Sequence, residues 1–191
     1  MIVLAGPNGS GKSTLYETRV APSFAGPFIN ADIIQRDELN DSDPGAAYEA
    51  ARIAETRRQD HLDARLDFVT ETVFSHPSKL ELVERAMAMG FDVIVMHVAV
   101  ETPDLSVERV TMRVEEGGHA VPPAKIRERY KRSGGLIRQA VRAATTGMVF
   151  DNSRFNTLPV RCLLFSMGKL TFALPYLPNW VRTVYADDLG V

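Results

Sequence analysis

The chain has 191 residues, of which 45% are hydrophobic and 24% charged, with a formal net charge of −2; this composition excludes disordered, collagen-like and low-complexity chains. The longest apolar run, residues 93–100, is too short to span a bilayer, and no leader typical of a signal peptide opens the chain. One cysteine and four scattered histidines exclude an internal disulfide and a structural zinc site, and they favour a reducing cytoplasm.

Strand and helix signals alternate from the start of the chain. The apolar residues 1–5 predict a buried strand that stops at a glycine-rich loop, and residues 12–19 predict a helix. A second short strand is expected at residues 28–30. Asp43 before a proline then predicts the N-cap of a helix over residues 44–65.

The middle of the chain continues the alternation. Residues 67–72 predict a strand, and Ser78 with Glu81 forms a capping-box pattern for a helix that Gly90 ends. Residues 91–100 are nearly continuous in apolar side chains, as strands of buried parallel sheets are.

Two helices are expected next, one capped by Thr102 and ended by the glycines at 117–118, the other starting at the prolines 122–123. Residues 148–150 predict a short last parallel strand. Residues 160–174 predict a hairpin around Met167-Gly168-Lys169.

This order predicts a single α/β domain over residues 1–191, with a mainly parallel sheet flanked by helices. Residues 109–142 are expected to form a helical lid, and residues 158–191 a C-terminal hairpin followed by a capping tail that contains Trp180.

The loop GPNGSGKS fits the P-loop pattern G-x-x-x-x-G-K-[ST] between a predicted strand and a predicted helix. Its backbone N–H groups and the helix N-terminus suit the phosphates of ATP. Lys12 is expected to reach the β- and γ-phosphates, and the Ser13 hydroxyl to ligate Mg²⁺. The predicted nucleotide-binding residues are Gly6, Pro7, Asn8, Gly9, Ser10, Gly11, Lys12, Ser13 and Thr14.

Transporter-type ATPases share this loop, but they need an apolar strand that ends in an Asp-Glu pair. Here the corresponding strand ends in Asp151-Asn152, and the chain is short for such a domain. The sequence therefore favours a kinase.

A kinase needs a base for the accepting hydroxyl. Asp32 follows the second strand at the sheet edge where α/β proteins bind ligands. It is our candidate base, with a helix N-cap as the alternative role. Glu71 and Thr72 end the next strand as candidate substrate contacts, and Glu71 is also a candidate Mg²⁺ partner through water. An ordinary strand-end acid is the alternative for Glu71.

The charge is unevenly distributed, because residues 109–142 carry nine basic and three acidic residues. Arg109 and Arg113 share one helix face, and Arg129 and Arg132 share a face of the next helix. We expect arginines from this lid to neutralise the γ-phosphate, and the segment 117–119 to act as its hinge. The remaining residues of note are interpreted as solvated charges (Arg127, Arg138 and Arg142), a loop hydrogen-bonder (His119) and core residues (His97 and Cys162).

Together these motifs resemble the zeta toxin family of P-loop kinases. The resemblance rests on residues 5–14, 29–32, 71–72, 113–130, 151–153 and 177–180, and so covers nearly the whole chain. It implies an ATP- and Mg²⁺-dependent kinase that phosphorylates the 3′-hydroxyl of UDP-N-acetylglucosamine, and a possible antitoxin partner that blocks the nucleotide site.

Carried over by motif, the resemblance assigns the phosphates and metal to Lys12 and Ser13, the base to Asp32 and a γ-phosphate contact to Arg113. Arg129 substitutes for the family's second lid arginine. The pair Gly134-Gly135 is expected to make the lid helix locally mobile or to break it.

Two other readings stay open. One is a kinase for a different hydroxyl, such as that of a nucleoside, a sugar or a polynucleotide end, although one basic strip on an acidic body argues against long nucleic acid. The other is an ATP-binding module without catalytic activity that acts through a protein partner.

Overall fold

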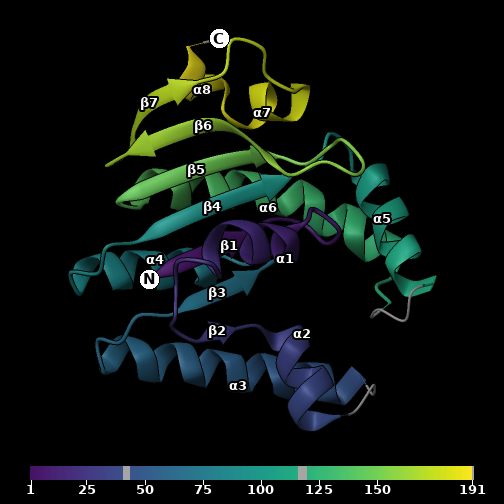
Figure 1. Cartoon of the computed structure of the whole chain (residues 1–191), viewed down its shortest axis with the longest axis vertical. Helices are drawn as coiled ribbons and strands as arrows, with labels where there is room; N and C mark the ends of the chain where they lie inside the picture. Colours follow the sequence, from purple (N-terminus) through teal and green to yellow (C-terminus); the bar gives the residue numbers. More distant parts are fainter. Residues whose placement is uncertain (41–43, 116–119, 191) are drawn as a thin grey trace.

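In the computed structural model, which describes residues 1–40, 44–115 and 120–190, one mixed sheet runs in the order β2-β3-β1-β4-β5-β6-β7 (Figure 1). Strands β1 to β5 are parallel, whereas β6 and β7 add an antiparallel hairpin at one edge. The strands are β1 (Ile2–Ala5), β2 (Phe28–Ile29), β3 (Val69–Thr72), β4 (Ile94–Ala99), β5 (Thr146–Asp151), β6 (Val160–Ser166) and β7 (Lys169–Ala173).

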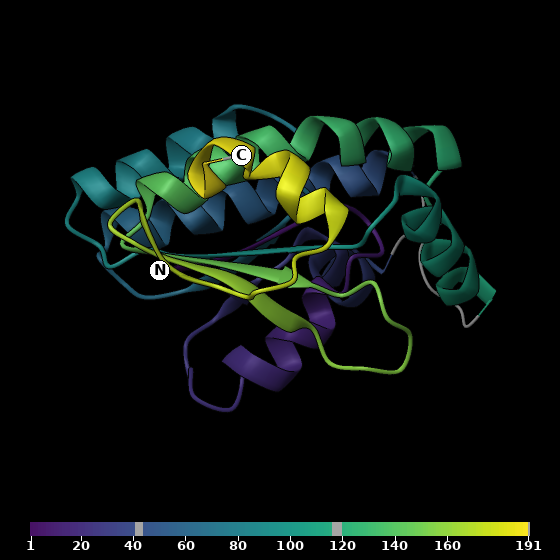
Figure 2. The same ribbon diagram turned by 90° about the horizontal axis from the view of Figure 1, so that it is seen from above.

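Helices cover both faces of this sheet. Figure 2 shows α3, α4, α6, α7 and α8 on one face and α1 on the other. The helices are α1 (Lys12–Leu15), α2 (Ala31–Ile33), α3 (Pro44–Asp63), α4 (Ser78–Ala88), α5 (Pro103–Glu115), α6 (Pro123–Ala143), α7 (Asn179–Val184) and α8 (Ala186–Leu189), with π-helical turns η1 (Tyr16–Val20) after α1 and η2 (Ile34–Leu39) after α2. Within the described ranges, none of them is long and apolar enough to cross a membrane.

Strand alternation divides the core into two layers. Along β1, Val3 and Ala5 face the cluster under α3, α4, α6 and α7, whereas Leu4 faces the cluster under α1. The same alternation turns Val69 of β3 toward α1. Because Glu71 lies two residues further along β3, its side chain leaves the sheet on the α1 side as well.

The predicted fold class is confirmed: a mainly parallel sheet lies between helices, and the hairpin turns at Met167 and Gly168, both with positive φ. The strand predicted at residues 148–150 is longer than expected, since β5 also includes residues 146, 147 and 151. The helix expected at residues 12–19 continues as the π-helical turn η1. The helical turns α2 and η2 lie where the alternative role of Asp32 as a helix N-cap allowed a helix to start, but their bounds were not predicted.

Two local predictions are wrong. The pair Gly134-Gly135 does not break the lid helix, because α6 is continuous through both residues. Ser78 does not cap α4: Pro77 is the N-cap, and the Ser78 backbone N–H donates to Nδ1 of His76 at 3.2 Å. The expected hinge at residues 117–119 and the expected N-cap at Asp43 lie outside the described residues.

Candidate active site

The P-loop connects β1 to α1 and can be built only with glycine at several positions. Gly9 and Gly11 have φ angles of 72° and 92°, the left-handed region that side chains rarely adopt. A Cβ atom on Gly6 would lie 2.0 Å from the Val98 carbonyl oxygen, and one on Gly11 would lie 2.1 Å from Nδ2 of Asn152. The same Asn152 amide donates to the Ser10 carbonyl at 3.0 Å. The loop is therefore held against the ends of β4 and β5.

Lys12 is buried and folds back onto its own loop. Its ammonium group donates to the Pro7 carbonyl at 3.0 Å and lies 3.6 Å from Oε1 of Glu71. A buried cation held by one carbonyl and one carboxylate is available for an incoming phosphate at the start of α1.

Glu71 gathers the polar groups of three neighbouring elements. Its Oε2 accepts from the Asn30 amide at 3.0 Å and from the Ser13 hydroxyl at 3.5 Å. Hydroxyl and carboxylate oxygens side by side suit Mg²⁺, which keeps several waters and uses few protein ligands. The described part of the chain contains no group of three or more His, Cys, Asp or Glu residues arranged for a metal.

Asp32 lies in the first turn of α2, beside Asn30. The Asn30 side chain caps this helix, because its Oδ1 accepts from the backbone N–H groups of Asp32 at 2.8 Å and Ile33 at 3.4 Å. The alternative reading of Asp32 as the N-cap is therefore wrong. Its carboxylate is exposed, and its role as a base stays a prediction.

Thr72 is engaged by its own loop. Its hydroxyl accepts from the backbone N–H of Phe74 at 3.0 Å and so shapes the turn after β3. Substrate contact by Thr72 stays a prediction.

Arg129 connects helix α6, which belongs to the predicted lid, to the P-loop. Its Nη1 donates to Oδ1 of Asn8 at 3.2 Å. Burial lowers the pKa of the Arg129 guanidinium from its ordinary value, and the nearby carboxylates of Asp32 and Glu128 oppose this shift. The charges of Arg129 and Asp32 therefore act on each other across the site. Arg132, three residues on, is exposed and pairs with Glu128 at 2.8 Å.

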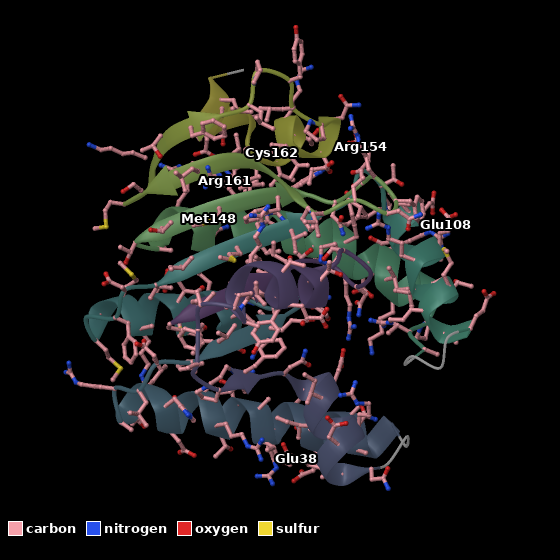
Figure 3. The ribbon with its side chains drawn as sticks, in the orientation of Figure 1. Glu38, Glu108, Met148, Arg154, Arg161 and Cys162 are labelled. Carbon is pink, nitrogen blue, oxygen red and sulfur yellow. The ribbon has the colours of Figure 1, made fainter. Side chains whose placement is uncertain are left out.

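Arg109 of α5 faces a different segment, the loop between β5 and β6. Its Nη2 donates to the Arg154 carbonyl at 3.1 Å, and its guanidinium lies 4.9 Å from the centre of the Phe155 ring. Figure 3 shows Arg154 on the same edge of the molecule as Glu108 of α5. Arg113 is exposed on the same helix, and its γ-phosphate role stays a prediction.

The interpretation of three α6 arginines as solvated charges needs correction for Arg138. Its side chain is 20% exposed and binds Asp188 at 2.6 Å and Asp187 at 2.7 Å, so it attaches α6 to α8. Arg127 and Arg142 are exposed but also paired, with Asp104 at 2.8 Å and Asp188 at 3.4 Å.

Two predicted core residues are confirmed, while the role predicted for His119 lies outside the described residues. His97 is buried, with Nδ1 2.8 Å from the Tyr185 hydroxyl. Cys162 is buried in β6, and burial raises the pKa of its thiol to about 11.

Two asparagines of the site were not predicted as functional residues. Asn30 orients Glu71 and caps α2, and Asn152 supports the P-loop. Both directly follow a parallel strand, at the edge where such sheets bind ligands. That position could have identified them from sequence.

A comparison with protein-family models identifies the family of this chain. The family model described as Zeta toxin matches residues 1–157. The chain belongs to the zeta toxin family. Among curated protein sequences, none matches the chain.

Solved structures agree with this zeta toxin fold. The chain is similar to the AvrRxo1-ORF1:-ORF2 complex with ATP (TM-score 0.65, 13% identity), covering 89% of this chain and 59% of that one. A structure of the PezAT toxin-antitoxin system of Streptococcus pneumoniae has a TM-score of 0.61 at 13% identity, with coverage of 96% and 77%. Shikimate kinase from Acinetobacter baumannii, in complex with shikimate, has a TM-score of 0.50 at 17% identity, with coverage of 82% and 84%. These likenesses establish a P-loop kinase fold, although the chain spans less than two thirds of the AvrRxo1 chain.

Proposed function

We propose that this chain is a kinase that transfers the γ-phosphoryl group of ATP to a hydroxyl group of a small molecule. The observation that carries the proposal is the contact between Arg129 of the lid helix and Asn8 of the P-loop, within electrostatic range of Asp32. Phosphoryl transfer requires a cation, a phosphate-binding loop and a carboxylate that can accept a proton, and this contact supports their joint use here.

Each side chain has a defined task in this reaction. Asp32 takes the proton of the acceptor hydroxyl while the oxygen of that hydroxyl bonds to the γ-phosphorus. The bond between the γ-phosphorus and the β,γ-bridging oxygen breaks, which releases ADP. Lys12 leaves Glu71 for the β- and γ-phosphates. Arg129 and, from α5, Arg113 offset the charge on the transferring group.

Magnesium, when bound, would neutralise the β- and γ-phosphate oxygens. Ser13 would ligate it directly and Glu71 through water, because their oxygens lie 3.5 Å apart at the start of α1. Asn30 keeps the Glu71 carboxylate turned toward this point.

For the acceptor we propose the 3′-hydroxyl of UDP-N-acetylglucosamine, which membership of the zeta toxin family favours. Other sugar nucleotides and nucleosides are the alternatives. The PezAT relative is described as a toxin-antitoxin system, so we also propose that an antitoxin protein covers the nucleotide site of this chain.

The test uses γ-labelled ATP with a panel of UDP-sugars, nucleosides and oligonucleotides. Wild-type protein should label one acceptor, and Asp32→Asn should lower that rate by about 100-fold or more while ATP still binds. Asp37→Asn is the matched control, because Asp37 is also exposed and pairs with Arg36 in η2. Tight ATP binding with no labelled acceptor would contradict the kinase proposal and favour a binding module.

A further inference from the structure

We propose that residues 179–189, here named the α7–α8 segment, position the P-loop and the lid helix for nucleotide binding. The proposal deepens the proposed function and rests on it. The segment lies beyond the residues that the family model matches, yet it is attached to three elements that carry the site.

The first attachment leads to the P-loop through β5. The buried Trp180 donates from Nε1 to Oδ1 of Asp151 at 2.8 Å, and Ser153 donates to the same oxygen at 2.5 Å. The next residue, Asn152, donates to the Ser10 carbonyl and fills the space beside Gly11. Trp180 therefore fixes the strand end from which Asn152 reaches the loop.

The second attachment is beneath the P-loop. The Tyr185 hydroxyl lies 2.8 Å from Nδ1 of His97, and the Trp180 ring packs against His97 with centroids 5.1 Å apart. His97 is paired in register with Ala5, the residue before Gly6. The α7–α8 segment therefore packs on the face of the sheet at the point where β1 ends and the P-loop begins.

The third attachment is to the lid helix α6. Arg138 binds Asp187 and the largely buried Asp188, as described above. A Cβ on Gly134 would lie 3.2 Å from Cγ2 of Val184, so the absence of a side chain there lets α7 approach α6 closely. This contact explains a glycine inside a continuous helix.

A helix transmits this attachment along its axis. Arg129 lies nine residues before Arg138, about 13 Å along α6. Tyr130, the residue after Arg129, attaches α6 to the end of β4, because its hydroxyl donates to the Val100 carbonyl at 2.5 Å. Since α6 is held at both points, its N-terminal half can present Arg129 to Asn8 in one position.

The test measures ATP affinity by calorimetry and unfolding by urea in the full chain. Asp188→Asn weakens the attachment to α6, and Trp180→Phe removes the donor to Asp151 while keeping an aromatic ring. Each should raise the Kd for ATP about fivefold. Arg182→Gln, at an exposed position of α7, is the matched control and should leave it unchanged.

Double variants separate positioning from general stability. Asp188→Asn should add less than about twofold to Kd in an Arg129→Gln background, and Trp180→Phe likewise in an Asn152→Ala background. The proposal would be overturned if Asp188→Asn or Trp180→Phe changed the Kd by the same factor in the wild-type and in the variant background. It would also be overturned if the single variants left the Kd unchanged. ATP binding without phosphoryl transfer in wild type would contradict only the proposed function, whereas absence of ATP binding would contradict both.

Discussion

Acidification should destabilise the folded chain through His97, whose side chain is 1% exposed in β4. Burial lowers the pKa of His97 from 6.5 to about 3, while the unfolded chain keeps the ordinary value. Below pH 6.5 the unfolded state therefore binds a proton that the folded state does not bind until about pH 3. The contribution of His97 to the free energy of unfolding is fully present above pH 6.5, and it falls progressively as the pH decreases from 6.5 toward 3.

The size of the effect follows from this shift. One proton bound only by the unfolded state changes the free energy of unfolding by about 1.4 kcal/mol per pH unit. Between pH 7 and pH 5 the loss from His97 alone amounts to about 2 kcal/mol, because the unfolded histidine titrates within this range.

Urea unfolding of wild type and His97→Gln at pH 7, 6 and 5 measures this contribution. The variant should be less stable at pH 7, because a buried contact with Tyr185 changes, but it should lose about 2 kcal/mol less on acidification to pH 5. Parallel curves for wild type and His97→Gln would refute the reasoning.

Three further predictions concern glycines and the loop support. Gly135→Ala should stabilise the chain by about 1 kcal/mol in urea unfolding, because nothing lies near its Cβ position in α6, whereas Gly134→Ala should gain less. Gly11→Ala should abolish ATP binding in calorimetry. Gly90 has a similar φ of 83° but open space around its Cβ position, so Gly90→Ala should cost about 1 kcal/mol of stability and leave ATP binding unchanged. Asn152→Ala should raise the Kd for ATP about fivefold at unchanged kcat.

The sequence predicted the elements that depend on short-range patterns. The apolar runs of β1 and β4 and the glycines of the P-loop specify strand, turn and helix locally, so the fold class and the position of Lys12 followed from them. The start of α2 was assigned to the wrong cap, because Asp32 was considered as the N-cap where Asn30 two residues earlier caps the helix. The contact of Asn30 with Glu71, a residue of another strand, could not be predicted from local sequence.

The long-range contacts could not be read from residue order. The sequence does not show which partner each arginine of residues 109–142 contacts. Arg109 binds the β5–β6 loop, Arg129 binds the P-loop and Arg138 binds α8. Gly134 suggested a helix break because the sequence does not show that Val184 packs against it. Tertiary packing determined each of these outcomes.

The ion pair between Lys12 and Glu71 makes the site close to electrically neutral before any ligand enters. An anion that takes Lys12 leaves the Glu71 carboxylate without its cation, and a divalent cation that binds there restores the balance. If the site works as proposed, nucleotide and metal binding should be thermodynamically linked, each increasing the affinity for the other by the same factor. The protein should favour the metal-nucleotide complex over either component alone.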